Sequence, residues 1–332
     1  MAVQFLDDPR EMDFRGISGL LAGFGPAGQR QDGARTEEAF LHSDSAFAVR
    51  DGDRVVAAGR ALSDRHAWTL VTDFAFLPGY REAGAELLER IKARYAGFEL
   101  YTWTDPGKIP FFEDHGFRRS KNSFTCAGAG DLPEPALPPQ AYYLPLGYRF
   151  ESEFYPQPGR FPRGKTGAPR VSSFRPVFSR DCDGLDFSRL NEVLTLAFGG
   201  RERDEAVTRD TFTRSRYVEF AYAGEKLIGC ARAESDGVSQ GFILNVAVDP
   251  DWQGFGLGRE IVFRLAARMG GQHIFLNTHP GSVGFYNRKG FRRLKTALLF
   301  PAHPEMPPEI AKGFVLPAGY RFPDEYESKW EE

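Results

Sequence analysis

The sequence predicts an α/β protein built from two tandem copies of one fold, and two internal matches carry this prediction. Thr104–Lys121 and Thr278–Lys295 are identical at nine of 18 positions without a gap, where unrelated segments of average composition would share about one. Leu144–Phe150 and Leu316–Phe322 agree at six of seven positions. The two offsets are 174 and 172 residues. The chain is therefore a tandem duplication with small insertions.

The first elements that the two copies share are a hairpin and a strand. Arg50–Arg60 aligns with Tyr222–Arg232, and each segment reads as two strands joined by a turn at a glycine. Asp73–Pro78 and Asn245–Pro250 come next, each a short apolar run that ends at a proline. Such a run is typical of a central strand that stops at its proline.

A helix follows this strand in both copies. Its apolar positions are Leu87, Leu88, Ile91 and Tyr95 in the first copy and Ile261, Val262, Leu265 and Met269 in the second. This spacing places the side chains on one face of a helix. Each copy then reads as strand, helix, hairpin, strand, helix, strand, short helix and strand.

The repeat divides the chain into residues 1–150, a linker over 151–170 and residues 171–332. The linker contains four prolines and three glycines and shows no apolar periodicity. The duplicated tails, Leu144–Phe150 and Leu316–Phe322, either close their own copy or reach across to the other. The sequence leaves both arrangements open.

Composition narrows the class of protein. Of 332 residues, 42% are hydrophobic and 26% charged, as in a globular protein with two sizeable cores. Residues 1–150 carry 17 basic and 21 acidic side chains, and residues 151–332 carry 25 and 24. Neither half has the basic excess of a nucleic-acid binder, so we expect no nucleic-acid partner.

Location is predicted from three further features. No apolar run approaches the roughly 20 residues of a membrane span, so we expect no membrane partner. The acidic start, MAVQFLDDPREMDF, lacks the pattern of a signal peptide. The cysteines Cys126, Cys182 and Cys230 lie far apart and form neither a CxxC motif nor an even disulfide framework. We therefore expect the cytoplasm, and no metal site.

The most informative segment is Asn245–Phe263, which reads NVAVDPDWQGFGLGREIVF. A strand ends at Asp249-Pro250, a glycine-rich loop follows over 253–258, and a helix begins near Arg259. Glycines let the backbone approach a ligand closely. The N-terminus of a helix offers unpaired N–H groups and positive potential, which favour an anion such as pyrophosphate.

A second glycine pattern, Gly23 to Gly28, also satisfies GxGxxG. A dinucleotide-binding turn would need a strand before it and a helix opening at it. Ile17–Leu21 instead reads as a short helix, and a proline lies within the motif. We interpret Gly23–Gly28 as a loop that ends a helix.

The motif V-x-V-x-P-x-x-Q-G-x-G-x-G from Val246 to Gly258 resembles the acyl-CoA pyrophosphate loop of the GNAT acetyltransferase superfamily. Phe285-Tyr286-x-Arg288-x-Gly290-Phe291 resembles the second signature of the same superfamily, in the right order. The resemblance covers residues 171–300 and extends to the first half through the repeat. It implies two GNAT folds, each a mixed, mostly antiparallel sheet with splayed parallel fourth and fifth strands flanked by helices.

The resemblance also implies a site for acetyl-CoA or another acyl-CoA as co-substrate. Backbone groups of the fourth strand would face the pantetheine arm, and loop amides would hold the pyrophosphate. Side chains of a short fourth helix would lie along the cofactor, with Arg288 as partner of the 3′-phosphate. The residues implied are Val246, Ala247, Val248, Gln253, Gly254, Phe255, Gly256, Leu257, Gly258, Arg259, Ser282, Tyr286 and Arg288.

Acyl transfer to an amine needs a base for the amine, a donor for the oxyanion and an acid for the thiolate. Tyr286 stands where the superfamily keeps its acid. A tyrosine pKa near 10 suits a thiolate whose conjugate acid has a similar pKa. For the base, His279 is a candidate, and a capping or packing role is at least as well supported. Asn245, Asp249 and Glu219 are outside candidates. Cys230 lacks a partner histidine for nucleophilic catalysis.

The first half lacks these features. Its loop is two residues shorter, and only Gly84 matches a loop glycine, Gly258. Glu82 and Glu86 bring negative charge to the helix start. Phe112 replaces Tyr286, and Asp114 replaces Arg288. We expect the first half to keep the fold and to have lost cofactor binding and chemistry.

The sequence therefore predicts an acyl-CoA-dependent N-acyltransferase that acetylates a small-molecule primary amine, with a monomer plausible because two fused copies can pack like a dimer. The alternatives are a non-catalytic acyl-CoA sensor and a protein or peptide N-acetyltransferase. An aminoacyl-tRNA-dependent transferase is disfavoured by the charge balance and by the intact loop.

Overall fold

The computed structural model describes residues 3–24, 32–127, 139–145, 148, 150, 175–200, 203–287, 291–302, 313–317, 320 and 322. The expected linker, 151–170, lies outside these residues. Within them, no helix is long and apolar enough to cross a membrane. The three cysteines are free thiols.

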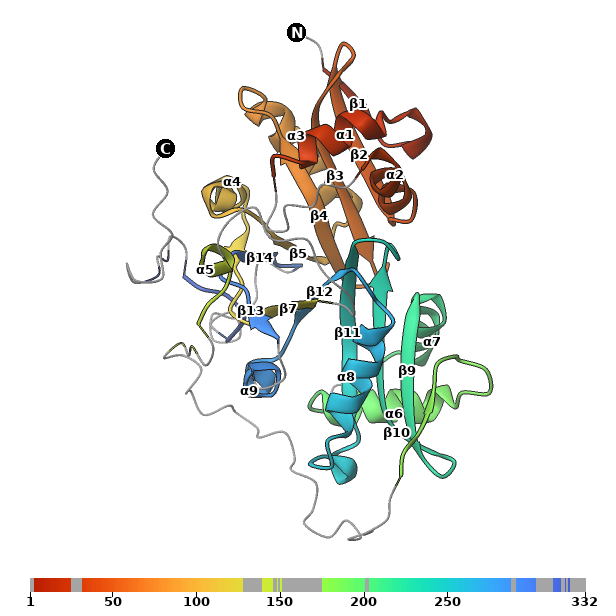
Figure 1. The fold of residues 1–332 in the computed structure, drawn as a ribbon. Coiled ribbons are helices and arrows are strands. Elements are labelled where there is room, and N and C mark those ends of the chain that lie inside the picture. Colours follow the sequence, from red (N-terminus) through yellow and green to blue (C-terminus); the bar gives the residue numbers. More distant parts are fainter. Residues whose placement is uncertain are drawn as a thin grey trace.

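Two seven-stranded mixed sheets dominate the described structure (Figure 1). The first sheet has the order β1-β2-β3-β4-β5-β14-β6. Its strands are β1 Gln4–Leu6, β2 Ser45–Asp51, β3 Arg54–Ser63, β4 Trp68–Phe76, β5 Glu99–Trp103, β14 Ala297–Phe300 and β6 Arg118–Arg119. Neighbouring strands are antiparallel except β4 and β5, which are parallel.

The second sheet has the order β13-β7-β12-β11-β10-β9-β8. Its strands are β13 Arg292–Arg293, β7 Ser123–Ala127, β12 His273–Asn277, β11 Gln240–Val248, β10 Lys226–Ser235, β9 Tyr217–Ala223 and β8 Val177–Ser179. Here β11 and β12 are the parallel pair. The predicted fold class is confirmed.

The two halves exchange a strand. β7 comes from the first half and pairs with β12 and β13 of the second sheet, and β14 comes from the second half and pairs with β5 and β6 of the first. Figure 1 shows these strands meeting between the two halves. Neither sheet is complete without a strand from the other half, which ties the halves into one unit.

The duplicated tails follow the same exchange. The backbone N–H of Leu144 donates to the carbonyl of Arg293, and that of Leu316 donates to the carbonyl of Arg119. Leu144, Phe150, Leu316 and Phe322 then form one small buried cluster. Of the two arrangements left open by the sequence, each tail reaches across to the other half.

Helices cover both faces of the sheets. They are α1 Phe14–Leu21, α2 Gly33–Leu41, α3 Arg81–Arg94, α4 Ile109–Asp114, α5 Pro139–Tyr142, α6 Phe187–Ala197, α7 Glu205–Arg214, α8 Leu257–Ala267 and α9 Val283–Asn287. Two helices precede each hairpin, where the sequence pattern predicted one. Both α2 and α7 start at an aspartate N-cap, Asp32 and Asp204, whose carboxylate accepts a backbone N–H. These caps are the signal that periodicity alone missed.

The other predicted elements are confirmed. The hairpin turns contain Gly52 and Gly224, each with positive φ. α1 ends at Leu21, directly before the Gly23–Gly28 pattern, so this loop ends a helix as interpreted; Gly25–Gly28 lie outside the described residues. The apolar stripes of α3 and α8 are buried against their sheets.

Candidate active site

The parallel strands of the second sheet separate part way along their length. β11 pairs with β12 from Gln240 and His273 to Ile243 and Leu276. Beyond this point, among the described residues, the edge of Leu244–Val248 that faced β12 has no partner strand. On its other side β11 stays paired with β10 as far as Val248. The predicted splay between the fourth and fifth strands is present.

A β-bulge marks the start of the open edge. The register with β10 shifts between Arg232 and Cys230, so that an extra residue is accommodated in β11. Asn245 adopts a φ of 51° there, a left-handed conformation that asparagine tolerates better than most residues. A bulge re-aims the backbone, and Val246–Val248 follow directly along the open edge.

The glycine loop lies at the end of this strand. Gly254 and Gly256 have φ values of +90° and +80°, and no atom lies within 4 Å of a side chain built on either residue. Gly256 is the N-cap of α8 and supplies no side-chain acceptor. Among the described residues, none accepts a hydrogen bond from the N–H groups of Leu257, Gly258 and Arg259. The helix starts two residues before the predicted Arg259, and its first donors are available to an anion.

Loop, strand and α9 converge at Gly258. A side chain built there would approach Val248 Cγ2 at 3.5 Å and Phe285 Cζ at 3.8 Å. The side chain of Gln253 reaches back to the carbonyl of Val248 at 3.1 Å. The structure therefore brings together three predicted parts of the site that are separated in sequence.

The side chains in and near the loop differ in their exposure to solvent. Leu257 is buried in the core, so its contribution to an anion site is its backbone N–H. Phe255 is 54% exposed. Arg259 is also exposed and lies 5.4 Å from the ring centre of Phe263. Ser282 ends a short 3₁₀ helix, Pro280–Ser282, directly before α9. Arg288 and Gly290 lie outside the described residues.

Tyr286 lies on α9 with its ring in the core. It packs against Phe285, Phe291 and Phe124 with ring centres 4.9, 5.3 and 5.7 Å away. Burial raises the pKa of Tyr286 well above 10, and a hydrogen bond with Thr278 opposes this shift. The phenol therefore stays protonated at working pH, as an acid must, but its pKa is less well matched to a thiol than the sequence suggested.

Phe124 and Thr278 are contacts of Tyr286 that sequence reasoning missed. Phe124 is on β7 and reaches Tyr286 only through the strand exchange. No spacing within either repeat predicts this contact. Thr278 directly follows β12. Its position beside the candidate base His279 is the sequence signal that could have indicated it as a site residue.

His279 has a capping role in the structure. Its Nδ1 accepts the backbone N–H of Gly281 at 3.2 Å, and its ring meets that of Phe314 edge-on at 5.8 Å. Burial lowers the pKa of His279. Because Nδ1 acts as an acceptor, the ring is neutral here and carries its proton on Nε2. A role for His279 as the base remains a prediction.

The outside candidates are all engaged by neighbours. Asn245 Oδ1 accepts Arg232 Nε at 2.6 Å. Asp249 binds Arg189 and caps the 3₁₀ helix Pro250–Trp252. Glu219 lies within ion-pair distance of Arg180 and Arg268. Burial raises the pKa of the Cys230 thiol to about 12, which disfavours a thiolate nucleophile.

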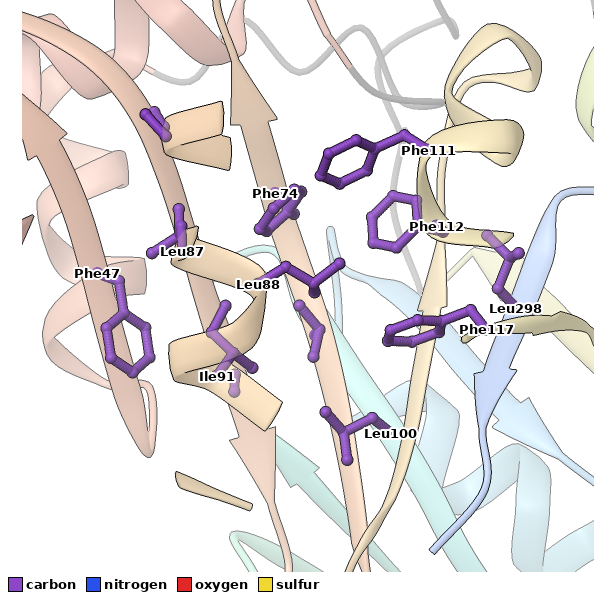
Figure 2. Close-up of a cluster of buried hydrophobic side chains, with 14 of the residues drawn as sticks. Phe47, Phe74, Leu87, Leu88, Ile91, Leu100, Phe111, Phe112, Phe117 and Leu298 are labelled. Atoms are coloured by element: carbon purple, nitrogen blue, oxygen red, sulfur yellow. The ribbon is translucent and has the colours of Figure 1, made fainter. Parts of the chain in front are cut away.

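The equivalent opening in the first sheet is filled by aromatic rings. β4 separates from β5 after Leu70 and Tyr101, and its bulge at Asp73 also has a φ of 51°. Phe74 on β4 faces Phe111 and Phe112 on α4 (Figure 2), with ring centres 5.9 and 5.4 Å away. The ring of Phe76 packs at a tilt against that of Phe111, with ring centres 4.7 Å apart.

Three of these rings replace smaller or polar residues of the second half, whereas Phe111 corresponds to Phe285. By the repeat, Phe74 and Phe76 correspond to Val246 and Val248, and Phe112 corresponds to Tyr286. Gly84, the surviving glycine, is needed for a different reason: a side chain there would lie 2.6 Å from Phe76 Cδ1.

Charged groups add to the closure of the first half. Arg81, at the start of α3, binds Asp114 at 2.7 Å. Lys108 occupies the position of Ser282, and its Nζ lies 3.4 Å from the ring centre of Phe24. Burial lowers the pKa of Lys108 to about 8. The region that holds an open edge in the second half is therefore packed with side chains in the first.

Two mixed sheets, each opened between its parallel strands and covered by helices, define the class of the molecule as a tandem α/β protein of the GNAT type. The crystal structure of a GCN5-related N-acetyltransferase from Sphaerobacter thermophilus matches 90% of this chain and 94% of its own length. The TM-score is 0.50 and the identity 16%. At this identity the likeness shows the fold alone.

The sequence itself matches a known family over part of its length. Residues 187–291 match the acetyltransferase (GNAT) family. A chloroplastic serotonin N-acetyltransferase 2 of Oryza sativa subsp. japonica is 34% identical over 119 residues, which are 34% of this chain and 59% of the relative. A chloroplastic GCN5-related N-acetyltransferase 1 of Arabidopsis thaliana is 33% identical over 121 residues, 35% of this chain and 60% of the relative. The match thus spans about three fifths of each relative.

Proposed function

We propose that the chain is an acyl-CoA-dependent N-acetyltransferase whose single working site lies in the second half. The observation that carries this proposal is the open edge of Leu244–Val248 beside the uncapped start of α8. An acyl-CoA fits this arrangement: unpaired strand groups match the amides of a pantetheine arm, and free helix N–H groups match a pyrophosphate. The named relatives are N-acetyltransferases, which supports the activity.

The groups of the chain have distinct tasks in this reaction. The amides of Leu257, Gly258 and Arg259 hold the pyrophosphate, and Gln253 fixes the loop to β11. A backbone N–H of Val246–Val248 stabilises the oxyanion. Bound acetyl-CoA supplies an acyl group activated as a thioester. Tyr286 gives its phenolic proton to the departing sulfur, and the pKa of Tyr286, raised by burial, keeps that proton available.

The acceptor is a primary amine of a small molecule in this proposal, and the compartment is the cytoplasm. In the first half, the aromatic packing around Phe74, Phe76 and Phe112 supports a role in structure instead of cofactor binding. No cluster of three or more potential metal ligands occurs in the described residues. The roles proposed above for the residues of the site require no metal ion.

The test is release of free CoA thiol from acetyl-CoA in the presence of an amine panel and, separately, of lysine-containing and N-terminal peptides. Turnover with a small amine and none with peptides supports the proposal. Turnover with peptides alone would favour a protein acetyltransferase. Tight acetyl-CoA binding with no turnover, unchanged in Tyr286→Phe, would favour a sensor.

A further inference from the structure

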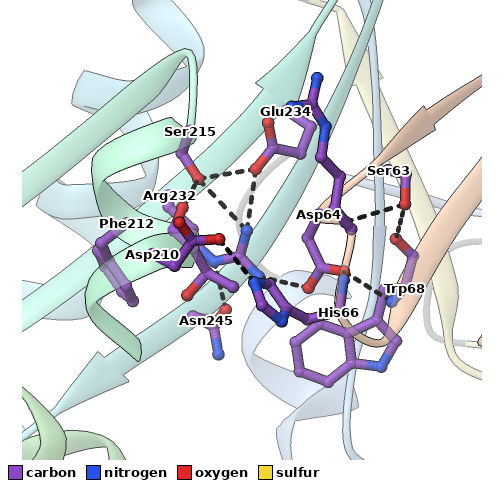
Figure 3. A network of polar contacts seen from close by, with 12 residues as sticks. Ser63, Asp64, His66, Trp68, Asp210, Phe212, Ser215, Arg232, Glu234 and Asn245 are labelled. Atoms are coloured by element: carbon purple, nitrogen blue, oxygen red, sulfur yellow. Dashed lines mark hydrogen bonds and ion pairs between the residues drawn. The ribbon is translucent and has the colours of Figure 1, made fainter. Parts of the chain in front are cut away.

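A polar network joins the two halves on the face of the second sheet opposite Tyr286. Its centre is Arg232, whose side chain is 1% exposed. Arg232 binds Asn245 at 2.6 Å, Glu234 at 2.9 Å and, across the interface, Asp64 of the first half at 2.8 Å (Figure 3). One guanidinium therefore connects the bulge at Asn245 with a residue of the first half.

Most of this network has a structural explanation, because it occurs twice. Arg60 and Asp236 are the repeat equivalents of Arg232 and Asp64, and they bind each other at 2.8 Å. Asp64 and Asp236 each also accept backbone N–H groups of their own turns. The two reciprocal pairs hold the interface together in the same way.

One feature is not repeated. His66, on the turn after β3, reaches α7 of the second half, where its Nε2 lies 2.8 Å from Asp210 Oδ2. The repeat places Val238 and Glu38 at the equivalent positions, and valine cannot replace an imidazole. This histidine–aspartate pair therefore occurs at the turn that packs on α7 and has no equivalent at the turn that packs on α2.

The contact with Asp210 indicates which nitrogen of the His66 imidazole is the hydrogen-bond donor. Arg214 binds the other carboxylate oxygen of Asp210 at 2.6 Å, and the hydrogen bonds from His66 and Arg214 lower the pKa of Asp210. An ionised carboxylate only accepts hydrogen bonds, so Nε2 of His66 is the donor, and in the neutral ring Nδ1 is then the nitrogen with the lone pair. The His66 side chain is 28% exposed, so solvent and a substrate can reach it.

The two faces of the second sheet have different tasks. Side chains alternate along β10, so Arg232 and Ala231 point to opposite faces. Ala231 belongs to the core with α8 and Tyr286, whereas Arg232 packs over Phe212 of α7. Because the cofactor loop and the acid lie on the α8 face, we take the opposite face as the side from which an amine approaches the open edge.

We propose that His66, contributed by the first half, is the base that takes the proton of the acceptor amine, with Asp210 as its positioning residue. This inference rests on the proposed acetyltransferase function and names the base that the sequence left open. The acceptor is a primary amine bound at the junction of the two halves.

The proton and bond changes balance. The amine nitrogen forms a bond to the thioester carbonyl carbon and gives one N–H proton to Nδ1 of His66, directly or through one water. The C–S bond breaks, and the sulfur takes the proton of Tyr286. Solvent then carries a proton from His66 to Tyr286, which restores both groups. The products are the N-acetyl amine and free CoA.

The test compares His66→Gln with Asp210→Asn and with the control His42→Gln. Glutamine keeps an N–H donor for Asp210 but cannot take up a proton, and His42 is an exposed histidine at the end of α2. General-base catalysis contributes roughly 10²–10⁴-fold. We expect His66→Gln to lower kcat about 100-fold or more without changing the acetyl-CoA Kd, and His42→Gln to change neither.

The pH profile separates a base from a structural residue. Wild-type kcat should fall at acidic pH, because a protonated imidazole cannot act as a base. This acid limb should vanish in His66→Gln and move in Asp210→Asn. The charged groups around His66 are Asp210 and Arg214 of α7, Arg232 and Glu234 of β10, and Asp64, Arg65 and Asp44 of the first half.

The outcomes distinguish the two proposals. If the wild type binds no acetyl-CoA or acetylates nothing, the proposed function fails and this inference with it. If the wild type is active and His66→Gln keeps its rate and its acid limb, the assignment of His66 alone is overturned. Loss of thermal stability in His66→Gln with an unchanged pH profile would also overturn it.

Discussion

The ends of β4 and β11, where each strand has separated from its parallel neighbour, occupy the same place in the two copies, but their surroundings differ. Both strands separate from their parallel neighbour, and both contain a bulge with a φ of 51° at Asp73 or Asn245. Around β4 the space is filled by phenylalanine rings, and around β11 the edge is open. The opening is thus a property of the fold, and side chains decide whether it can hold a ligand.

The comparison also shows that the first half differs from the second in two ways, of which an alignment of the loops reveals only one. The first half has no glycines equivalent to Gly254 and Gly256, to which we assign the anion site. It also has Phe74, Phe76 and Phe112, which remove the space. We therefore expect that a glycine loop introduced into the first half would not by itself create an acyl-CoA site.

The largest expected effect comes from exchanging the residues at one equivalent position. Tyr286→Phe removes the proposed acid and should lower kcat by about 10²–10⁴-fold, while the acetyl-CoA Kd, measured by calorimetry, stays the same. The reverse change, Phe112→Tyr, should bring no second activity and should cost about 1–3 kcal/mol of unfolding free energy, because it buries a hydroxyl. Equal kcat values for Tyr286→Phe and the wild type would contradict the role of Tyr286.

The exchanged strands offer a second, smaller contrast. Phe124 on β7 and Leu298 on β14 are repeat equivalents, and both are fully buried. Alanine at either position should lower the unfolding free energy by about 2–5 kcal/mol in denaturant titrations. Only Phe124→Ala should also lower kcat at a temperature where both variants are folded, since Phe124 packs on Tyr286. An equal loss of kcat in both variants would show that the effect is general.

Lys108 gives the smallest effect, and its sign follows from its pKa. Burial lowers this pKa to about 8 from an unfolded value of 10.5. Between these values the unfolded state binds more protons, so the contribution of Lys108 to stability rises with pH and is fully present only above about pH 10.5. Lys108→Met should therefore raise the unfolding free energy at pH 7, measured by urea titration. In this variant the unfolding free energy should also rise less between pH 8 and 10 than it does in the wild type. If the unfolding free energies of wild type and variant changed equally with pH, the buried environment described for Lys108 would be contradicted.

The sequence predicted the duplication, the order of most elements and the position of the open loop, because each depends on local patterns. Gly254 and Gly256 supply positive φ, and Leu87 and Ile261 belong to helical stripes, all readable from spacing. The extra helices α2 and α7 were missed because they are polar and are defined by their caps, Asp32 and Asp204.

The strand exchange and the base that we propose could not be predicted in this way. β7 and β14 have the same pattern whether they complete their own sheet or the other one, and only the packed structure decides between the two. His66 is separated by 144 residues from Asp210, and no motif links them. Contacts made by the exchange, such as that of Phe124 with Tyr286, depend on this global arrangement.

The most direct test of the central claim is titration calorimetry with acetyl-CoA on the wild type, Gly256→Glu and Gly271→Glu. Both glycines have positive φ and open space around them, but Gly271 lies beyond the other end of α8. The account predicts one site per chain, kept in Gly271→Glu and lost in Gly256→Glu, because the new carboxylate would lie at the anion-binding end of the helix. Two sites per chain, or unchanged binding in Gly256→Glu, would contradict it.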